Sequence, residues 1–430
     1  MRIEPVTRLV GHMAVPGDKS ISHRSVLLGA LCDGETRVTG FGRSADTEAT
    51  IEAVRSLGIT VYEHGGDTLH VFGRGLHGLV SPDRPIDCAN AGTLVRLLTG
   101  ILAGQRGQRF ELTGDASLSA RPMKRVTEPL ARMGAGVVTE DGHLPIRVEG
   151  RPLSSITYEL PVASAQVKSA ILLAGLYADG ETTVVEPVQT RDHTELMLEA
   201  AGVPVTRREK SVSVRPAEHL ELGEVEVPGD FSSAAPFIVA ATLVPGSELH
   251  LHGVNLNPRR TGLLTILARM GGRVTVYNRR RIGGEHAGDL EVRSAELVAT
   301  TVLPAEVPLA IDELPLFALL ASCAHGSSRV RGAEELRAKE SDRVESTVDA
   351  LRALGQHVQA TEDGFRIRGV PTRPRGGRVR SRGDHRIAML GAIAALDSQD
   401  GVEIEDAECV AVSFPGFFEL LESLRREAAA

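Results

Sequence analysis

The six residues VPGDKS at Val15–Ser20 have a near copy, VPGDFS, at Val227–Ser232. An apolar run of helical length follows each stretch, and a glycine and a short strand-like run come after it. Similarity between distant parts of one chain indicates a repeated structural unit. The two copies stand about half the chain apart, so the sequence predicts two similar halves.

The same pattern occurs six times, with copies that start at residues 15, 85, 161, 227, 308 and 381. Apolar residues at i, i+3 and i+4 predict a second, amphipathic helix in every copy, over 46–57, 121–133, 191–201, 260–270, 340–354 and 414–425. Alternating apolar residues predict strands after them, for example at 59–62 and 274–277. We therefore expect an α/β protein with two domains, each built from three βαβαββ units.

The domain boundaries follow from the two VPGD stretches. Residues 15–227 form the predicted N-terminal-half domain, and residues 1–14 with 228–430 form the predicted C-terminal-half domain. The chain must then cross between the domains near residues 15 and 227. The first dozen residues are expected to pack with the C-terminal half.

The composition narrows the class of protein. The chain has 430 residues, of which 42% are hydrophobic and 24% charged, and its formal net charge is -8. Fibrous and disordered classes are excluded, and the negative charge argues against nucleic-acid binding. The four cysteines form no CxxC motif, so we expect no metal centre. The N-terminus has no apolar signal segment and no apolar run is long enough to span a bilayer, so we expect a cytoplasmic protein.

Lysines, arginines and hydroxyl residues gather where the predicted helices begin. These clusters lie at 19–24, 90–96, 121–124, 164–168, 190–191, 339–343 and 384–386. Free N–H groups and a partial positive charge at a helix N-terminus attract anions. Ser, Thr, Asp and Asn at such positions are also ordinary N-caps, but cations there oppose the helix dipole and need another reason. The sequence predicts a cleft between the two domains that gathers phosphate or carboxylate groups.

Few residues are candidates for proton transfer: Asp312, Glu340, His385 and Lys19. Asp312 interrupts an apolar stretch, and a carboxyl group among apolar neighbours is suited to accept a proton near neutral pH. An ordinary capping role for Asp312 stays open at this stage. Glu340 stands between Lys339 and Arg343, which favour its ionised form unless a substrate intervenes.

Together these stretches resemble the 5-enolpyruvylshikimate-3-phosphate synthase family over nearly the whole chain. The matching motifs, in order, are PGDKSISHR at 16–24, NAGT at 90–93 with Arg96, RPM at 121–123, SAQ at 164–166, DE at 312–313, KESDR at 339–343, DHR at 384–386 and SFP at 413–415. The resemblance implies two domains, each with three units around a pseudo-threefold axis.

The resemblance also implies a reaction. It implies transfer of the enolpyruvyl group of phosphoenolpyruvate to the 5-hydroxyl of shikimate-3-phosphate, with release of phosphate through a tetrahedral intermediate. It implies small-molecule partners only, no metal or organic cofactor, no membrane and a monomer.

The family pattern assigns a role to each matching residue. Shikimate-3-phosphate would be bound by Lys19, Ser20, Arg24, Ser164, Ala165 (through its backbone), Gln166, Arg191, Asp312 and Lys339. Phosphoenolpyruvate would be bound by Lys19, Gly92, Arg121, Gln166, Arg343 and Arg386. Asp312 would be the base for the 5-hydroxyl, Glu340 the proton donor to the methylene carbon and later its acceptor, and His385 a neighbouring hydrogen-bonding group.

The chain departs from some family members at two positions. Val412 stands where some members carry a lysine before the Phe-Pro pair, and Ala165 stands where some carry a second serine. Gly92 matches the inhibitor-sensitive form of the pocket, so glyphosate is expected to compete with phosphoenolpyruvate.

Two alternative functions remain. A sister transferase that acts on UDP-N-acetylglucosamine would carry a reactive cysteine in the loop 118–123, which has none here. A non-catalytic module that binds anions or RNA ends would not need Asp312 and Glu340 together, and an RNA binder would favour a basic surface.

Overall fold

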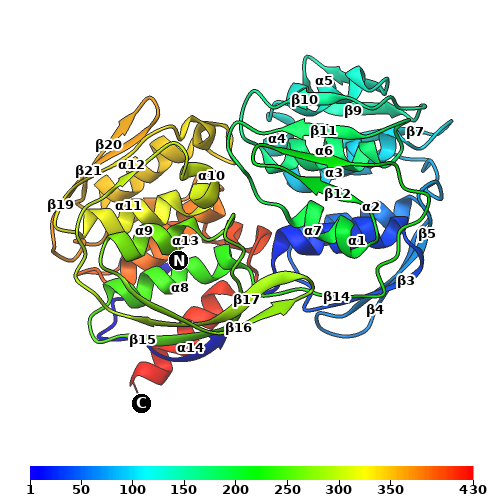
Figure 1. Cartoon of the computed structure of the whole chain (residues 1–430). Helices are drawn as coiled ribbons and strands as arrows, with labels where there is room; N and C mark the ends of the chain where they lie inside the picture. Colours follow the sequence, from blue (N-terminus) through cyan, green and yellow to red (C-terminus); the bar gives the residue numbers. More distant parts are fainter. Residues whose placement is uncertain (430) are drawn as a thin grey trace. The chain divides into compact units, whose positions relative to one another are not determined.

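The chain folds into two compact units, as seen in a computed structural model that describes residues 1–429, with side chains through Arg425. We call residues 17–228 with 282–285 the N-terminal unit, and residues 1–16, 229–281 and 286 onward the C-terminal unit. The repeated pattern of the sequence is visible in each unit (Figure 1).

Three helices form the centre of the N-terminal unit: α1 (Lys19–Leu31), α3 (Gly92–Ala103) and α6 (Ala165–Gly175). The amphipathic helices are α2 (Ala45–Ser56), α5 (Lys124–Arg132) and α7 (His193–Ala200), and α4 (Ala116–Ser119) is a single turn. The strands form three sheets: β14 (Glu224–Glu226), β3 (Asp33–Thr39), β5 (Leu69–Arg74) and β4 (Thr60–Glu63); β6 (Ile86–Asp87), β7 (Arg109–Thr113), β9 (His143–Glu149) and β8 (Gly136–Glu140); β10 (Thr157–Glu159), β11 (Thr182–Val185), β13 (Ser211–Val214) and β12 (Val205–Arg207).

The C-terminal unit repeats this plan around α8 (Phe231–Leu243), α11 (Leu314–Ser322) and α13 (His385–Leu396). Its other helices are α9 (Gly262–Arg269), α10 (Val307–Ala310), α12 (Arg343–Ala353) and α14 (Phe417–Ala429), with 3-10 turns η1 (Ile311–Glu313), η2 (Glu334–Ala338) and η3 (Ala407–Val412). Its sheets are β2 (Val10–Ala14), β15 (Glu248–Asn255), β17 (Glu285–Arg293) and β16 (Arg273–Ile282); β18 (Thr301–Val302), β19 (Gly326–Val330), β21 (Gly364–Gly369) and β20 (His357–Thr361); β1 (Arg2–Ile3), β23 (Val402–Glu405) and β22 (Gly377–Arg380).

The four-stranded sheets share one strand order. In the second copy, β6 runs parallel to β7, and β9 and β8 follow as an antiparallel pair. The third and fifth copies have the same order in β10–β11–β13–β12 and β18–β19–β21–β20. The sixth copy differs, because its sheet has three strands and the antiparallel partner of β23 is the N-terminal strand β1.

The two VPGD stretches mark a reciprocal exchange of edge strands. β2, which precedes α1 in the chain, pairs in parallel with β15, whereas β14, which precedes α8, pairs in parallel with β3. The Asp18 N–H donates to the Pro228 carbonyl and the Asp230 N–H donates to the Pro16 carbonyl, both at 2.8 Å. A Cβ on Gly17 would lie 1.8 Å from the Gly40 carbonyl oxygen, so this position of the motif requires glycine.

Five of the six amphipathic helices begin two or three residues later than the sequence predicts. Pro122 disfavours a helical conformation at Arg121, so α5 begins only at Lys124. The Asp342 side chain accepts hydrogen bonds from the Val344 and Glu345 N–H groups, which starts α12 at Arg343. As a consequence, the charged residues at these positions lie in the turns that precede the helices.

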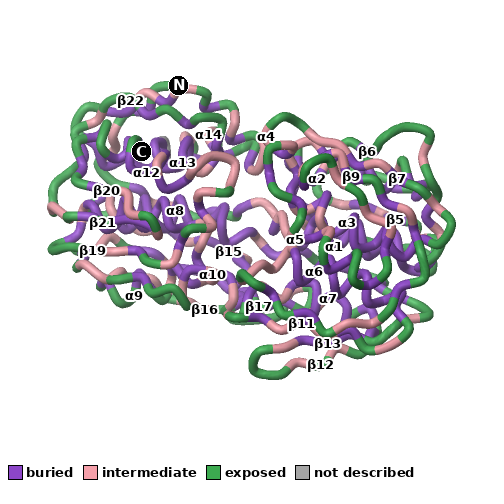
Figure 2. The backbone as a smooth tube through the Cα atoms, turned by 90° about the horizontal axis from the view of Figure 1, so that it is seen from above, coloured by how far each residue is buried: buried purple, intermediate pink, exposed green. Residues whose placement is uncertain are grey.

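The central helices carry most of the apolar core. Helices α1, α3 and α6 pack together, as do α8, α11 and α13, and nearly all of their residues are buried (Figure 2). Their polar residues therefore stand mostly in the first helical turn. Among the residues that the structure describes, no helix combines the length and the apolar character that crossing a membrane requires.

Candidate active site

The N-terminal end of α1 presents two of the predicted residues, Lys19 and Ser20. The Asp18 carboxylate caps the helix by accepting the Ile21 N–H at 3.1 Å. The Lys19 ammonium forms an ion pair with Asp46 of α2, with Nζ and Oδ2 2.7 Å apart. This pair holds a lysine at a helix N-terminus, where its charge adds to that of the free N–H groups.

Arg24 is buried one turn further along α1 and is only 4% exposed. Its guanidinium donates to the Thr194 hydroxyl at 2.6 Å, to the Ser169 hydroxyl at 2.9 Å and to the Ser20 carbonyl at 2.8 Å. Burial lowers the pKa of Arg24 to about 10, although Glu195 and Asp18 oppose that shift. The sequence-predicted Arg191 also lies near, because its charge contributes to the lowering of the Arg24 pKa.

A second cluster joins the starts of α3 and α6. Arg96 donates to the Gly92 carbonyl and to Gln166 Oε1, both at 2.9 Å. The Gln166 amide nitrogen donates to the Thr93 hydroxyl at 2.9 Å. The sequence-predicted Gly92 and Gln166 are therefore brought together, and Arg96 connects them.

Arg121 belongs to the same cluster. Its guanidinium donates to Asn90 Oδ1 at 2.7 Å, and a Cβ on Gly92 would lie 3.1 Å from its Nη1. Gly92 thus leaves room beside the two arginines, Arg96 and Arg121.

The remaining predicted residues of this unit lie at two helix starts. Ser164 is the N-cap of α6, with its hydroxyl accepting the Val167 N–H at 3.4 Å, and Ala165 is the first helical residue. Arg191 lies in the turn before α7. Lys168, next along α6, is fully buried and pairs with Glu186 at 3.1 Å and with Glu195 at 2.7 Å. This lysine therefore anchors the turn before Arg191 instead of facing a ligand.

In the C-terminal unit, Arg343 joins the two candidate acid/base residues. Its Nη1 lies 3.3 Å from Asp312 Oδ1, its Nη2 lies 2.6 Å from Glu340 Oε2, and its Nε lies 2.8 Å from Asp384 Oδ2. Arg343 is 2% exposed. Burial opposes its charged form, but the three carboxylates outweigh that effect and raise its pKa above the usual value.

Asp312 lies in the turn η1, just before α11. Its Oδ2 lies 3.4 Å from Arg260 Nη1, and Arg260 also pairs with Asp230, the N-cap of α8, at 3.1 Å. The adjacent Glu313 is buried and accepts a hydrogen bond from the Ser232 hydroxyl. Asp312 is not the N-cap residue of α10, η1 or α11, whose N-cap positions are Glu306, Ala310 and Glu313.

Lys339 and Glu340 lie in the extended turn that leads into α12. Lys339 is half-buried, and burial lowers its pKa, although the charge of Asp312 opposes the shift. Glu340 retains some exposure, with 22% of its side chain accessible. Both residues therefore stand at the edge of the cluster that Arg343 organises.

The start of α13 supplies three further residues. The Asp384 carboxylate caps the helix by accepting the Arg386 N–H at 2.9 Å. Burial raises the pKa of Asp384, but the charge and hydrogen bonds of Arg343 together with the charge of His385 outweigh it, so the net shift is downward. His385 is buried as the first helical residue, and Arg386 donates to the Ser232 carbonyl at 3.2 Å.

Several residues that contact the site were not predicted from the sequence. No function was predicted for Asp46, Asp230, Arg260 and Asp384. Asp46, Arg260 and Asp384 each contact a predicted site residue, and Asp230 pairs with Arg260. Arg260 could have been found from the repeats, because it stands where Arg121 and Arg191 stand in their copies. Asp46 gave no signal, since an acidic residue in a first helical turn is ordinary.

The fold defines the class of protein. The chain is similar to the enolpyruvyl transferase NikO from Streptomyces tendae, with a TM-score of 0.77, 20% identity, and coverage of 98% of this chain and 96% of that one. At this identity the likeness concerns the fold alone. It confirms the predicted two-domain fold of the enolpyruvyl transferases.

More specific similarities define the family. The family model of EPSP synthase (3-phosphoshikimate 1-carboxyvinyltransferase) matches residues 3–421. The 3-phosphoshikimate 1-carboxyvinyltransferase of Acidithiobacillus ferrooxidans is 51% identical over 415 residues, which cover 96% of this chain and 95% of that protein. An EPSP synthase structure from Acinetobacter baumannii has a TM-score of 0.87 and 42% identity, with 98% and 97% of the two chains covered. The chain belongs to the EPSP synthase family.

Proposed function

We propose that this chain transfers the carboxyvinyl group of phosphoenolpyruvate to the 5-hydroxyl of shikimate-3-phosphate and releases inorganic phosphate. The observation that carries the proposal is the contact of one buried guanidinium, Arg343, with both Asp312 and Glu340. An addition–elimination reaction needs two groups that exchange protons and a cation beside them that binds an anionic substrate.

In this proposal, the N-terminal unit supplies most of the groups for shikimate-3-phosphate. Its ligands are Lys19, Ser20, Arg24, Ser164, Ala165, Gln166 and Arg191, with Asp312 and Lys339 from the C-terminal unit. The fork geometry of a guanidinium suits a phosphate group. The hydrogen bonds of Arg24 to Thr194 and Ser169 support this role, because these neutral hydroxyl groups fix the guanidinium without themselves cancelling its charge.

Phosphoenolpyruvate is assigned to Lys19, Gly92, Arg121, Gln166, Arg343 and Arg386. The contacts of Arg96 with Gly92 and Gln166 support this assignment, since they fix the start of α3 beside Arg121. Glyphosate, an inhibitor of the family, is then a competitor for this pocket. Val412 lies in η3 and contributes no cation there.

The proposed chemistry conserves protons through two steps. In the addition, Asp312 accepts the proton of the 5-hydroxyl, the oxygen attacks C2 of phosphoenolpyruvate, and Glu340 protonates C3 to form a tetrahedral ketal. In the elimination, Glu340 takes a proton back from C3, the double bond re-forms, and the C–O bond to phosphate breaks. Asp312 returns its proton to the leaving phosphate, and His385 and Lys19 are assigned to hydrogen-bond the reacting groups.

The ion pair between Glu340 and Arg343 sets a condition on this mechanism. At 2.6 Å the guanidinium favours the ionised carboxylate, yet Glu340 must carry a proton in order to donate it. An anionic substrate that binds Arg343 competes for that positive charge and allows Glu340 to take up a proton. Substrate binding and proton uptake are therefore coupled in the proposal.

Three further expectations belong to the proposal. The reaction needs no metal or organic cofactor, the chain is a monomer, and it acts in the cytoplasm on small molecules, without a nucleic-acid or membrane partner. Sedimentation of the full chain at several concentrations tests the oligomeric state, and activity after chelator treatment tests the requirement for a metal.

The decisive experiment measures phosphate release from phosphoenolpyruvate with and without shikimate-3-phosphate. We expect release only when both substrates are present. Asp312→Asn and Glu340→Gln should each lower kcat by about 10²-fold or more while shikimate-3-phosphate still binds. Wild-type turnover in both variants would refute the assigned roles, and absence of release by the wild-type chain would refute the function.

A further inference from the structure

The outward face of the β18–β19–β21–β20 sheet carries an unusual concentration of positive charge. Along β21, Phe365 and Ile367 are buried, and the alternating Arg366 and Arg368 are exposed on the other face. The strand register places Arg329 of β19 directly opposite Arg366. The same face therefore carries arginines on two neighbouring strands.

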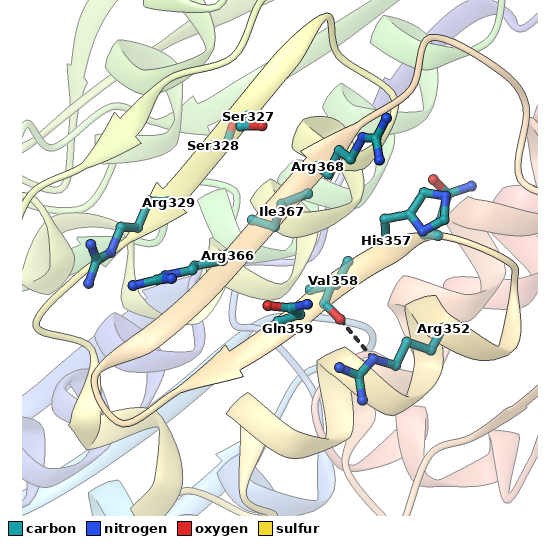
Figure 3. A pocket seen from close by; sticks show the side chains of 11 residues that line it. Ser327, Ser328, Arg329, Arg352, His357, Val358, Gln359, Arg366, Ile367 and Arg368 are labelled. Carbon is teal, nitrogen blue, oxygen red and sulfur yellow. Dashed lines mark hydrogen bonds between the residues drawn. The ribbon is translucent and has the colours of Figure 1, made fainter.

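These side chains line an open groove of about 610 Å³ (Figure 3). The residues that line it are Ser327, Ser328, Arg329, Arg352, Gln356, His357, Val358, Gln359, Arg366, Ile367 and Arg368. None of them is acidic. Arg352, at the edge of the groove, donates to the Val358 carbonyl at 2.7 Å, which leaves its charge unneutralised by that bond.

The repeated architecture offers an internal comparison, because other sheets balance their strand arginines with glutamates on neighbouring strands. Such pairs are Arg37–Glu224 at 2.9 Å, Arg147–Glu111 at 2.8 Å, Arg293–Glu248 at 3.2 Å and Arg378–Glu403 at 3.0 Å. The strands β18, β19, β20 and β21 contain no aspartate or glutamate. The arginines of this sheet therefore have no cross-strand carboxylate of the kind found in those four pairs.

Two observations indicate that these arginines lack the negative charge and the hydrogen-bond acceptors that an anion would supply. Like charges directly opposite each other on neighbouring strands are destabilising, and Arg329 and Arg366 are such a pair. The Nε atom of Arg329 is buried without a hydrogen-bond partner in the described part of the chain. The nearby Asp363, in the β20–β21 turn, accepts hydrogen bonds from Thr361 and Gly332, and the charge of Arg329 contributes to lowering its pKa. Asp363 balances part of the Arg329 charge, but it faces neither Arg366 nor Arg368 in the strand register.

We propose that this groove, which we call the β21 groove, binds a small molecule that carries adjacent phosphate groups. Guanidinium forks match phosphate oxygens, and one arginine on β19 beside two on β21 suits a ligand with at least two anionic groups. The size of the groove is that of a small-molecule site. None of the proposed substrate-binding residues lines this groove, so the site is separate from the one assigned to catalysis. Helix α12 carries Arg343 at its first residue and Arg352 near its other end.

The test uses inorganic pyrophosphate as the probe and isothermal titration calorimetry of the full chain at low ionic strength. The variant is the double substitution Arg366→Ala with Arg368→Ala. The matched control is Arg378→Ala with Arg380→Ala, which removes two exposed arginines of β22 that are also two residues apart but pair with Glu403 and Glu405. Both variants change the net charge equally and touch no residue assigned to catalysis, so kcat should stay at the wild-type value in both.

We expect the β21-groove variant to lose one pyrophosphate-binding event, or to weaken it at least tenfold, and the β22 control to retain it. Any binding of pyrophosphate to the proposed active site is common to all three proteins, so the difference between the variants isolates the groove. Orthophosphate should bind the wild-type groove at least tenfold more weakly than pyrophosphate.

Three outcomes would overturn the proposal. Equally weakened pyrophosphate binding in both variants would show that the effect comes from the net charge alone. Unchanged binding in the β21-groove variant would exclude the site. A change in the sedimentation of that variant without any change in pyrophosphate binding would indicate that the arginines contact an acidic protein surface instead.

Discussion

Arg24 of the N-terminal unit and Arg343 of the C-terminal unit are both buried arginines, but they have opposite surroundings. Arg24 donates to two hydroxyls and a carbonyl, and burial lowers its pKa to about 10. Arg343 contacts three carboxylates, which raise its pKa above the usual value despite burial. The fold thus places the same side chain in two different electrostatic roles.

This difference indicates that Arg24 serves substrate binding, whereas Arg343 serves the residues that transfer protons. An arginine held by neutral groups keeps its charge for a ligand, and the cost of burying it favours an incoming anion. An arginine surrounded by carboxylates holds them at fixed positions, and a bound anion changes the balance among them. We therefore expect loss of Arg24 to affect substrate affinity, and loss of Arg343 to affect both stability and turnover.

The largest effect is expected for Arg343→Ala. Removing the guanidinium leaves Asp384 and Glu340 without their main cation, so the free energy of unfolding should fall by about 3–5 kcal/mol, and kcat should fall by about 10³-fold. Urea unfolding and phosphate release measure the two effects. Arg382→Ala, which removes an exposed partner of Asp349, is the control and should cost less than about 1 kcal/mol. Equal stability of the two variants would contradict the comparison.

Arg24→Met should mainly weaken shikimate-3-phosphate binding. Ser169 and Thr194 remain hydrogen-bonded to each other at 2.7 Å after the guanidinium is removed, so the loss of unfolding free energy should be about 1–2 kcal/mol. The KM for shikimate-3-phosphate should rise by about 10²-fold, because a charge-assisted pair of bonds to phosphate is lost. Arg24→Lys should give an intermediate KM. A large loss of stability with an unchanged KM would make Arg24 a structural residue.

The same contrast shows what could be predicted from the sequence. The six helix pairs could be predicted, because their apolar periodicity repeats along the chain, and the charged residues before those helices could be found as candidates. The partners of Arg343 could not be derived from spacing, since Asp312 and Asp384 lie 31 and 41 residues away and only the fold brings them together. The starts of α5 and α12 were predicted too early, because Pro122 and the Asp342 cap act locally against the helical pattern.

A smaller effect is expected for Gly92→Ala, which tests whether cations in the N-terminal unit need space beside them. The new Cβ would lie 2.7 Å from Arg96 Nη1 and 3.1 Å from Arg121 Nη1, so both guanidiniums must shift. We expect the KM for phosphoenolpyruvate to rise about tenfold, roughly 1.4 kcal/mol, while the KM for shikimate-3-phosphate stays within twofold. The control is Gly223→Ala, since a Cβ there meets open space. Equal effects on both KM values would show a general distortion of the unit.

The smallest effect concerns His23, the neighbour of Arg24 on α1, and extends the comparison to pH. Burial, together with the charges of Lys19 and Arg24, lowers the pKa of His23 well below its ordinary value. The unfolded chain then binds a proton near pH 6.5 that the folded chain does not bind, so stability is complete above that pH and is lost as the pH falls below it. The limiting slope is about 1.4 kcal/mol per pH unit.

Urea unfolding between pH 7.5 and 5.5 measures this slope in the wild type and in His23→Gln. We expect the variant to be less stable at pH 7.5, because the bond between His23 Nδ1 and the Thr50 hydroxyl, 2.6 Å long, is disturbed. Its free energy of unfolding should fall less steeply on acidification, with a slope smaller by the contribution of about one proton. His219→Gln, which changes an imidazole that is 81% exposed, is the control for the loss of a histidine at the surface. If His23→Gln kept the full slope, the pH dependence would not come from His23, and the lowered pKa of its imidazole would be refuted.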